Sequence, residues 1–343
     1  MTLRRDVSRT VVVMLGGIGN MVLLTPALQR LAEAFPGVTV DAVLSSRAPW
    51  EVVERAPFAG CPFVLSGRGS LLRLVLWLRR PRIGMLLVST GHNPKKAARL
   101  ARLSGATVAV GEGVGPWSGP TTLRPEVSAN LEIVDQVCPA SPRSPAPRVW
   151  TTGDDEAAAE RFLAERLPGA PRVALHLGCG AAMAYKRWSV EGFHEVGRRL
   201  LARGVSLLVV AGPDEAAEVE ASVREVWGAG GRVAVAGTGV ALRTKARLLA
   251  RCDALVSNDS GPMHLAAAVG TPCVAVFGPT DPARFGPWGP GHCAVEAPLP
   301  CRPCYPEGTR CTERPCLTGV PASEVWAALE SVLQSPRPRT SRP

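Results

Sequence analysis

The stretch 257–268, with the sequence SNDSGPMHLAAA, follows a short apolar run at 253–256 and decides how we interpret the fold. The apolar run predicts a buried strand, and the small polar residues after it predict a sharp turn into a helix. Pro262 suits the first helical position, and Gly270 suits a left-handed C-terminal cap. A strand that ends in such a turn leaves backbone N–H groups aimed at one spot, so we expect an anion-binding site there.

Two side chains beside this turn are candidate ligand contacts. Asp259 supplies a carboxylate that can hold hydroxyls or a cation, and His264 lies in the first turn of the expected helix, on its open end. The alternative is an ordinary strand-to-helix turn with a packed histidine. The other loops of the chain are needed to choose between these interpretations.

Length and composition place the chain among globular proteins. Its 343 residues fit two domains, and 46% of them are hydrophobic. We find no apolar run of about 18 residues, so we expect no membrane span. The run 11–15 is too short for a signal-peptide core and leads into a glycine loop, so we expect a cytoplasmic protein with reduced thiols. The net charge of +10 predicts an anionic partner: a phosphorylated substrate, an acidic membrane face or nucleic acid.

Apolar runs alternate with helical patterns through the first half of the chain. The run 10–15 is typical of a strand covered on both faces, and a glycine loop then leads into a helical stretch that ends near residue 34. Thr25 and Pro26 inside that stretch predict a kink or a restart with Thr25 as N-cap. The alternation predicts a parallel, doubly wound sheet. Further strands are expected at 38–44, 62–65 and 83–88, and helices at 71–79 and 95–103.

The glycine loop 16–20, GGIGN, is a poor match to a dinucleotide-binding fingerprint. After Gly17 and Gly19 that fingerprint needs Gly or Ala at position 22, which is Val22. Asp41 falls where a ribose-binding acid is expected, but alone it is weak support. A loop of this kind more generally lets the backbone approach a ligand closely, so we disfavour hydride transfer.

A Pro-rich segment without a period separates the two halves. We assign 1–140 to a first domain, 141–149 to a semi-extended linker and 150–322 to a second domain with the same alternation. A final helix is expected at 323–335, packed back on the first domain, followed by a disordered tail at 336–343. In the second domain, strands are expected at 172–177, 205–210, 233–235, 254–257 and 272–277, and helices at 156–166, 191–202, 215–226 and 242–250.

Three loops of the second domain are expected to meet, because ligands bind outside the carboxyl ends of strands in such sheets. The loop 178–188 contains Lys186, which can reach a phosphate or can simply be solvated beside a structural Trp188. In the loop 211–215 we favour Asp214 as a helix cap. The third loop is the turn at 257–261. Beyond it, Thr280 and Asp281 either contact a sugar or base or only shape the turn after the last strand.

With these residues in place, the chain resembles glycosyltransferase family 9, the bacterial heptosyltransferases of lipopolysaccharide assembly. The resemblance covers nearly the whole chain, and its motifs are specific only in combination. It implies two Rossmann-like doubly wound domains facing a central cleft, the glycosyltransferase B-type fold. It also implies inverting sugar transfer that needs no metal or other cofactor, with the donor on the second domain and the acceptor on the first. The motifs are GGIGN at 16–20, TPAL at 25–28, KRW at 186–188, NDSGPMH at 258–264 and FGPTD at 277–281.

The resemblance also assigns residues to the donor. The donor is a nucleotide-diphospho-sugar, ADP-heptose or similar, and the acceptor is a saccharide of lipopolysaccharide or another cell-surface glycan, free or lipid-linked. The implied donor-binding residues are Gly17, Gly19, Lys186, Asp259, Ser260, Gly261, His264 and Thr280.

The chain departs from the family pattern in two places. Asn20 stands where the family usually has the Asp that is its presumed catalytic base, and an amide cannot accept a proton at neutral pH. Either Asn20 only orients the acceptor while another group acts as base, for which we name His92, or the enzyme is slow or inactive. Arg243 lies near a position where some members have Glu facing the ribose, which leaves the donor nucleotide open.

Four cysteines are close together after the last expected strand. Cys301, Cys304, Cys311 and Cys316 lie in a Cys-rich loop at 292–316 with the spacing C-x2-C-x6-C-x4-C. Four such thiols in a cytoplasmic chain suggest a structural zinc ion or an iron–sulfur cluster, although the spacing matches no standard zinc finger. The alternative is free thiols.

The basic residues of the first domain suit phosphorylated sugars at the inner membrane face, or they form solvated helix faces. Few aromatic residues are interleaved with them, so we expect no nucleic-acid partner. Two further functions stay open: a sugar-nucleotide-binding protein whose catalysis Asn20 has weakened, and a sugar-nucleotide epimerase on the same architecture. The basic residues concerned are Arg68, Arg73, Arg79, Arg80, Arg82, Lys95, Lys96, Arg99 and Arg102.

Overall fold

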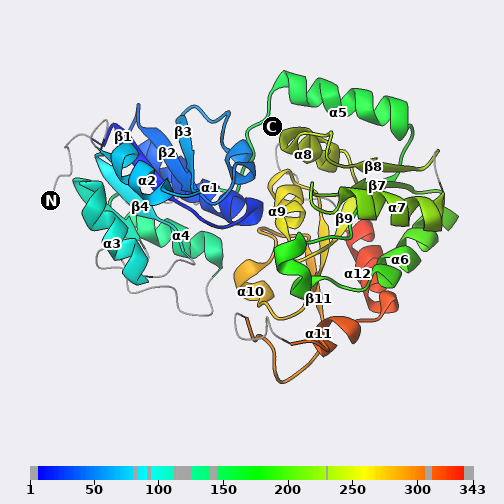
Figure 1. Cartoon of the computed structure of the whole chain (residues 1–343). Helices are drawn as coiled ribbons and strands as arrows, with labels where there is room; N and C mark the ends of the chain where they lie inside the picture. The colour runs from blue at the N-terminus through cyan, green and yellow to red at the C-terminus, as the bar shows by residue number, and fades with distance from the viewer. Residues whose placement is uncertain are drawn as a thin grey trace. The chain divides into compact units, whose positions relative to one another are not determined.

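The computed structural model divides the chain into two compact units, Met1–Trp150 and Thr151–Pro343 (Figure 1). It describes residues 7–79, 83–90, 94–111, 114, 125–138, 145–228, 231–305 and 311–335. Part of the expected linker packs on the first unit. Ala146 accepts a hydrogen bond from Gln29 at 3.0 Å, and the Arg148 N–H donates to Thr25 at 2.9 Å. Residues 145–150 therefore belong with the first domain.

The first unit is built on a five-stranded parallel sheet with the order β3-β2-β1-β4-β5. The order reverses between β1 and β4, so the loops after these two strands lie at the switch point where doubly wound sheets bind ligands. The expected strands and helices are present, whereas β5 and α4 were not predicted. The strands are β1 Arg9–Val13, β2 Thr39–Leu44, β3 Ala59–Val64, β4 Met85–Val88 and β5 Val108–Gly111; the helices are α1 Ile18–Ala34, η1 Ala48–Val52, α2 Ser70–Leu78, α3 Pro94–Ser104 and α4 Glu126–Asp135.

Helix α1 does not restart at Thr25, contrary to one of our expectations, although Pro26 lies inside it. Pro26 has no N–H to donate to the Val22 carbonyl one turn earlier. The Thr25 hydroxyl donates to that carbonyl instead, at 2.7 Å, so the buried acceptor keeps a partner. This exchange explains why one 17-residue helix tolerates a proline in its middle.

The second unit has a six-stranded parallel sheet with the order β11-β10-β9-β6-β7-β8. Its order reverses between β6 and β9, which places the loops after these strands at the second switch point. The predicted alternation is confirmed, and β11 is an added strand. The strands are β6 Arg172–His176, β7 Ser206–Val210, β8 Val233–Ala236, β9 Ala254–Asn258, β10 Cys273–Phe277 and β11 Cys293–Glu296; the helices are α5 Gly153–Arg166, η2 Ala181–Lys186, α6 Val190–Ala202, α7 Ala216–Trp227, α8 Leu242–Ala250, α9 Gly261–Ala268, α10 Pro282–Phe285, α11 Pro315–Thr318 and α12 Ala322–Gln334.

The C-terminal helix α12 packs on the sheet of the second domain, whereas its expected contact with the first domain stays a prediction. It lies beside α6 and against β9, β10 and β11, as the red helix of Figure 1 shows. Val325, Leu329 and Val332 are buried in the core cluster of the second sheet. Because α12 follows directly on α11 of the same unit, its apolar face is covered by the nearest sheet.

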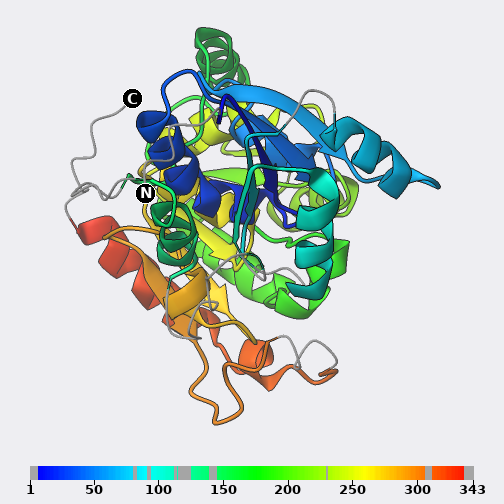
Figure 2. The same ribbon diagram turned by 90° about the vertical axis from the view of Figure 1, so that its left-hand side faces the viewer.

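Two further features of the helices bear on function. None of the helices in the described part of the chain is long and apolar enough to cross a bilayer. Helix α2 stands out at the side of the first domain, as Figure 2 shows.

Candidate functional site

Two of the three loops of the second domain that were expected to meet, 178–188 and 257–261, meet beside the N-terminus of α9, together with the turn after β10. Lys186, at the end of η2, places its ammonium nitrogen 2.7 Å from a carboxylate oxygen of Asp259. The Thr280 hydroxyl donates to the same oxygen at 2.6 Å. Asp259 and Thr280 are buried, and the side chain of Lys186 is 15% exposed. A lysine, a carboxylate and a hydroxyl are thus gathered next to the open N–H groups of a helix.

Aromatic rings flank the Lys186 ammonium group. Its nitrogen lies 5.5 Å from the ring centroid of Tyr305 and 5.9 Å from that of Phe285. The negative faces of such rings attract a cation without neutralising it. The two rings and Asp259 together restrict the position of the Lys186 ammonium group.

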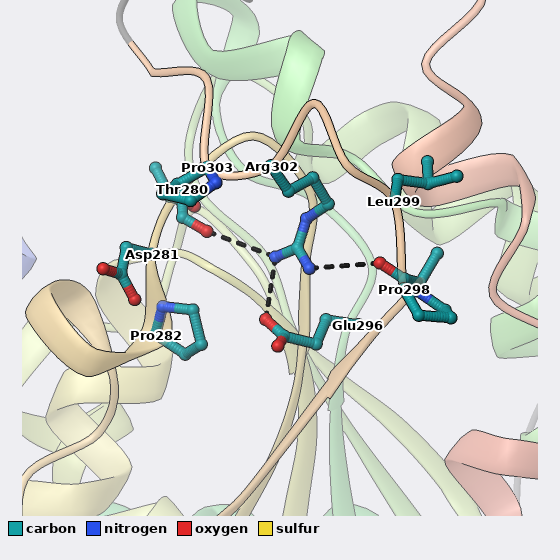
Figure 3. Close-up of a pocket in the computed structure, with 9 residues that line it drawn as sticks. Thr280, Asp281, Pro282, Glu296, Pro298, Leu299, Arg302 and Pro303 are labelled. Carbon is teal, nitrogen blue, oxygen red and sulfur yellow. Dashed lines mark hydrogen bonds and ion pairs between the residues drawn. The ribbon is translucent and has the colours of Figure 1, made fainter.

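Arg302 holds the turn that carries Thr280 (Figure 3). Its guanidinium group donates to the backbone carbonyls of Gly278, Thr280 and Ala297 and pairs with Glu296 at 2.9 Å. A cavity of about 200 Å³ lies beside these groups. Four of the five guanidinium donors of an arginine can be used in this way, which makes Arg302 a rigid brace for the turn. Sequence inspection gave no reason to select it.

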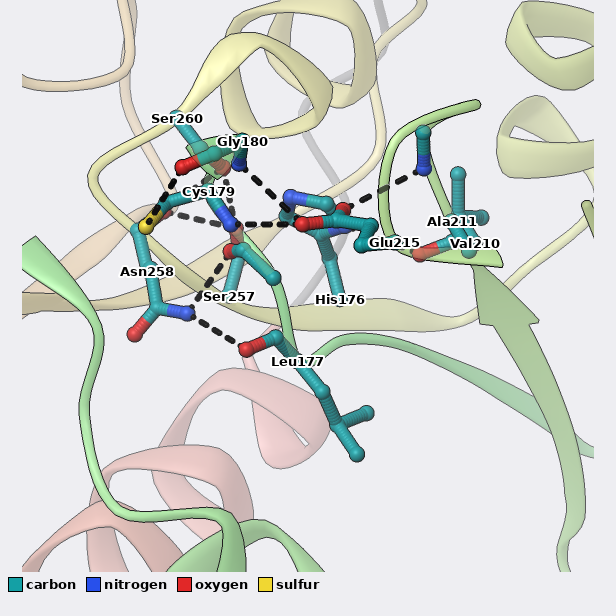
Figure 4. A network of polar contacts seen from close by, with 12 residues as sticks. His176, Leu177, Cys179, Gly180, Val210, Ala211, Glu215, Ser257, Asn258 and Ser260 are labelled. Carbon is teal, nitrogen blue, oxygen red and sulfur yellow. Dashed lines mark hydrogen bonds and ion pairs between the residues drawn. The ribbon is translucent and has the colours of Figure 1, made fainter. Parts of the chain in front are cut away.

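Asn258 connects the loop after β6 to the turn after β9 (Figure 4). Its amide nitrogen donates to the carbonyls of Leu177 and Gly178 at 3.0 and 2.8 Å, and its amide oxygen accepts from the Trp188 N–H at 2.8 Å. Asn258 is fully buried, so each of these polar groups would lose its partner if the side chain were shortened. The amide thus fixes both ends of the Lys186 loop.

Glu215 is a buried carboxylate that the sequence interpretation missed (Figure 4). It accepts hydrogen bonds from the backbone N–H groups of Cys179, Gly180 and Gly212 at 3.1–3.2 Å. Gly178 is required beside it, because a Cβ there would lie 1.9 Å from a carboxylate oxygen. Asp214, our expected cap, does not fill that position: Glu215 is the N-cap residue of α7, and its side chain turns to the neighbouring loop.

The charge of Glu215 is balanced by local donors. Burial alone would raise the pKa of Glu215, but the nearby His176 ring, the loop N–H groups and Arg187 hold the pKa below its ordinary value. Burial also lowers the pKa of His176, so that ring is neutral at neutral pH. The backbone donors and Arg187 therefore do most of the balancing.

We expect Glu215→Gln to lower the free energy of unfolding by about 2 kcal/mol at pH 7, because an NH2 group would then face buried N–H donors. The pKa of Glu215 in the folded protein lies below the ordinary value of 4.5. The contribution of its charge to the free energy of unfolding is therefore present above pH 4.5 and is lost as the pH falls through the pKa of the folded protein. Urea unfolding from pH 7 to pH 3.5 should show the difference from the parent narrowing below about pH 4.5. Glu225→Gln, which is also exposed on α7, is the control. A constant difference across this pH range would contradict the assignment.

Helix α9 begins at Gly261 after the N-cap residue Ser260, and Pro262 occupies its second position, one later than predicted. The predicted cap is confirmed, because Gly270 follows the helix with a φ of 80°. His264 is buried and does not lie on an open end. Burial lowers the pKa of His264 to about 4, and its Nδ1 atom has no partner within the described residues. His264 is therefore neutral at pH 7 and can offer a hydrogen bond but no charge.

The glycine loop of the first domain opens α1. Gly17 is the N-cap residue, and its N–H donates to the side-chain oxygen of Asn20 at 3.2 Å, while Gly19 is buried in the first turn. A Cβ at Gly16 would lie 2.6 Å from the Asn20 side chain, so this glycine gives that side chain its space. His92 lies outside the described residues.

Two predicted contacts are engaged within the protein. Arg243 pairs with Asp155 at 3.3 Å and so ties α8 to α5. Asp281 caps α10 by accepting from the Ala283 N–H at 2.8 Å. Both side chains thus have a structural partner of their own.

The four cysteines of the Cys-rich loop form no disulfide bond. Burial raises the pKa of Cys316, and the nearby thiols of Cys304 and Cys301 raise it further. Across the parts of the chain that the structure describes, no group of three or more His, Cys, Asp or Glu side chains is placed to hold a metal ion.

Comparison with known proteins identifies related sequences. The sequence model of glycosyltransferase family 9 (heptosyltransferase) matches residues 124–314. Lipopolysaccharide heptosyltransferase 1 of Pseudomonas aeruginosa is 32% identical over 191 residues, which are 51% of this chain and 51% of that protein. Lipooligosaccharide heptosyltransferase 2 of Campylobacter jejuni is 30% identical over 95 residues, 27% of this chain and 30% of that protein. The chain thus spans about half the length of the first relative and under a third of the second.

Solved structures share the fold. The glycosyl transferase family 9 protein of Veillonella parvula superposes with a TM-score of 0.77 at 20% identity, covering 96% of this chain and 98% of that one. An E. coli heptosyltransferase with ADP-2-deoxy-2-fluoro heptose has a TM-score of 0.68 at 20% identity, covering 94% and 99%. The prediction of two doubly wound domains of the glycosyltransferase B type is confirmed.

Proposed function

Because the chain belongs to glycosyltransferase family 9, we propose that it transfers a sugar from a nucleotide-diphospho-sugar to a saccharide acceptor with inversion at the anomeric carbon. One observation carries the proposal: Lys186, Asp259 and the N-terminus of α9 converge on one spot at the switch point of the second sheet. A lysine beside a helix N-terminus suits a pyrophosphate, whose negative charge increases as the sugar departs.

Each group at this spot has a role in the proposed reaction. Lys186 and the first N–H groups of α9 bind the pyrophosphate and stabilise the leaving nucleoside diphosphate. Asp259 and Thr280 offer an acceptor and a hydroxyl to the sugar. Since the lysine and the helix end supply the positive charge here, we propose that the transfer step needs no metal ion. The structural metal at the Cys-rich loop stays a prediction.

We propose ADP-heptose or a similar nucleotide sugar as donor. The support is a neighbour of the same fold whose structure contains an ADP-linked heptose analogue, together with relatives named as heptosyltransferases. The proposed acceptor is a saccharide of lipopolysaccharide or of another cell-surface glycan, presented by the first domain.

Thermal unfolding with a panel of ADP-, UDP-, GDP- and CMP-linked sugars tests the donor assignment. A ligand at about 100 times its Kd stabilises the folded state by about 2.7 kcal/mol, so the matching donor should raise the Tm by several degrees. The ADP-linked sugars are expected to give the largest shift, and ADP alone a smaller one. If no nucleotide sugar of the panel shifts the Tm, the assignment of this site is wrong.

A further inference from the structure

One segment of the first domain carries a charge equal to that of the whole chain. Residues 55–111 contain ten Lys and Arg and no Asp or Glu, while the other 29 Lys and Arg of the chain are balanced by its 29 Asp and Glu. Eight of the ten lie among the described residues, and all eight are exposed. The net charge of +10 is therefore concentrated on one part of the surface.

Helix α2, inside this segment, has both buried and exposed leucines. Leu74 and Leu78 are buried in the core of the first sheet. Leu71, Leu72 and Leu76 of the same helix are 71%, 68% and 60% exposed. These three are the most exposed large apolar side chains in the described part of the chain. Large apolar side chains that are exposed together on one short helix are suited to contact with a partner.

Helix α3 packs beside α2 and adds charge to the same surface. It buries Ala97 toward the core and exposes a basic face together with the partly apolar end at Leu103. Figure 2 shows α2 standing out from the domain, which leaves its outer face open. The exposed basic residues of the two helices and the loop before them are Arg68, Arg73, Arg79, Lys95, Lys96, Arg99 and Arg102.

We propose that α2 and α3 form a docking surface for an anionic lipid bilayer. The three outer leucines enter the boundary between headgroups and acyl chains, and the basic side chains contact lipid phosphates. A second copy of the chain is a poor occupant, because a symmetric contact would bring two such basic segments together. A soluble polyanion would satisfy the charges but would leave the leucines in water. The inference rests on this surface alone and does not depend on which sugar is transferred.

Vesicle flotation with the full-length chain tests the proposal. Vesicles of phosphatidylcholine alone are compared with vesicles of phosphatidylglycerol and phosphatidylcholine at one to three. We expect the parent to float with the anionic vesicles, to stay behind with the neutral ones, and to bind less as salt is raised. The variant L71S/L72S/L76S should bind the anionic vesicles at least about tenfold more weakly, because its apolar insertion is lost. The variant K95Q/K96Q/R99Q/R102Q should also lose binding.

Variants on the second domain control for the loss of an exposed leucine and for the loss of four positive charges. Leu333→Ser removes a leucine that is 40% exposed, and it should float like the parent. The basic control removes four exposed arginines and should also leave flotation unchanged. It is R161Q/R198Q/R224Q/R232Q.

Three results would overturn the proposal. The first is that the parent does not float with anionic vesicles. The second is that the serine variant binds the vesicles as tightly as the parent, which would show attraction to any polyanion, nucleic acid included. The third is that sedimentation shows self-association through the leucines and no vesicle binding is found. Circular dichroism verifies that each variant is folded. Nucleotide-sugar binding is measured on the same samples. Loss of vesicle binding without loss of nucleotide-sugar binding would leave the sugar-transfer proposal intact, and loss of nucleotide-sugar binding alone would leave the membrane proposal intact.

Discussion

Replacing Asn20 by Asp should raise the rate of sugar transfer by about 10²-fold or more. General-base assistance is typically worth ~10²–10⁴ in rate, and an amide cannot provide it. Asn20 is the third residue of α1, and its oxygen accepts from the Gly17 N–H. A carboxylate can accept the same bond and is favourable near a helix N-terminus, so the variant should fold as well as the parent.

The measurement is kcat/KM for acceptor with a saturating donor, recorded as a function of pH. At low pH the new carboxylate is protonated, so the gain in kcat/KM of the Asp variant should disappear there. The pH profile of the parent should not show this decrease at low pH. Asn20→Ser is the control, since it shortens the side chain without adding a base. Equal kcat/KM values for the parent and the Asp variant would show that another group deprotonates the acceptor.

Replacing Lys186 by Met should abolish the thermal shift with donor and lower kcat/KM by about 10²–10³-fold. Removing one preorganised donor from a developing negative charge typically has an effect of this size. Methionine keeps most of the apolar volume between the Tyr305 and Phe285 rings, so the loss reports the charge. Arg198→Met, on the exposed face of α6, is the control and should leave both readouts unchanged.

A second variant separates binding from stability. Lys186→Met leaves the buried Asp259 without its cation and should lower stability by about 1–3 kcal/mol. The double variant K186M/D259N removes that unpaired charge, so it should recover stability but not transfer. If the double variant recovers both, Lys186 acts only as the partner of Asp259, and the site does not bind the pyrophosphate through it.

Local sequence patterns were sufficient for most of the fold. Apolar runs of five or six residues separated by helical patterns indicated the parallel sheets, because both faces of such strands are covered. The glycine and proline positions around α9 indicated a strand-to-helix turn, and the structure contains it. Helix α4 and strands β5 and β11 were missed, since none of them has a strong period of its own and each depends on its neighbours.

The site was predicted less completely, and the reason is the distance along the chain between its parts. Glu215 meets loop amides 35 and 36 residues away, and Asn258 bonds carbonyls 80 and 81 residues away. Nothing near Glu215 in the sequence distinguishes it from Asp214 as the carboxylate that turns inward. The sequence likewise did not indicate which sheet the apolar face of α12 would cover, because that depends on which sheet face is left uncovered by other helices.

By itself, the sequence determined the elements, the turn before α9 and the candidate role of Lys186, because propensity, periodicity and turn chemistry act over a few residues. Only the tertiary structure decided which carboxylate balances which N–H groups, that Arg302 braces the Thr280 turn, and that three leucines of α2 remain in water. These outcomes depend on strand order and burial, which bring together groups that are far apart in the chain.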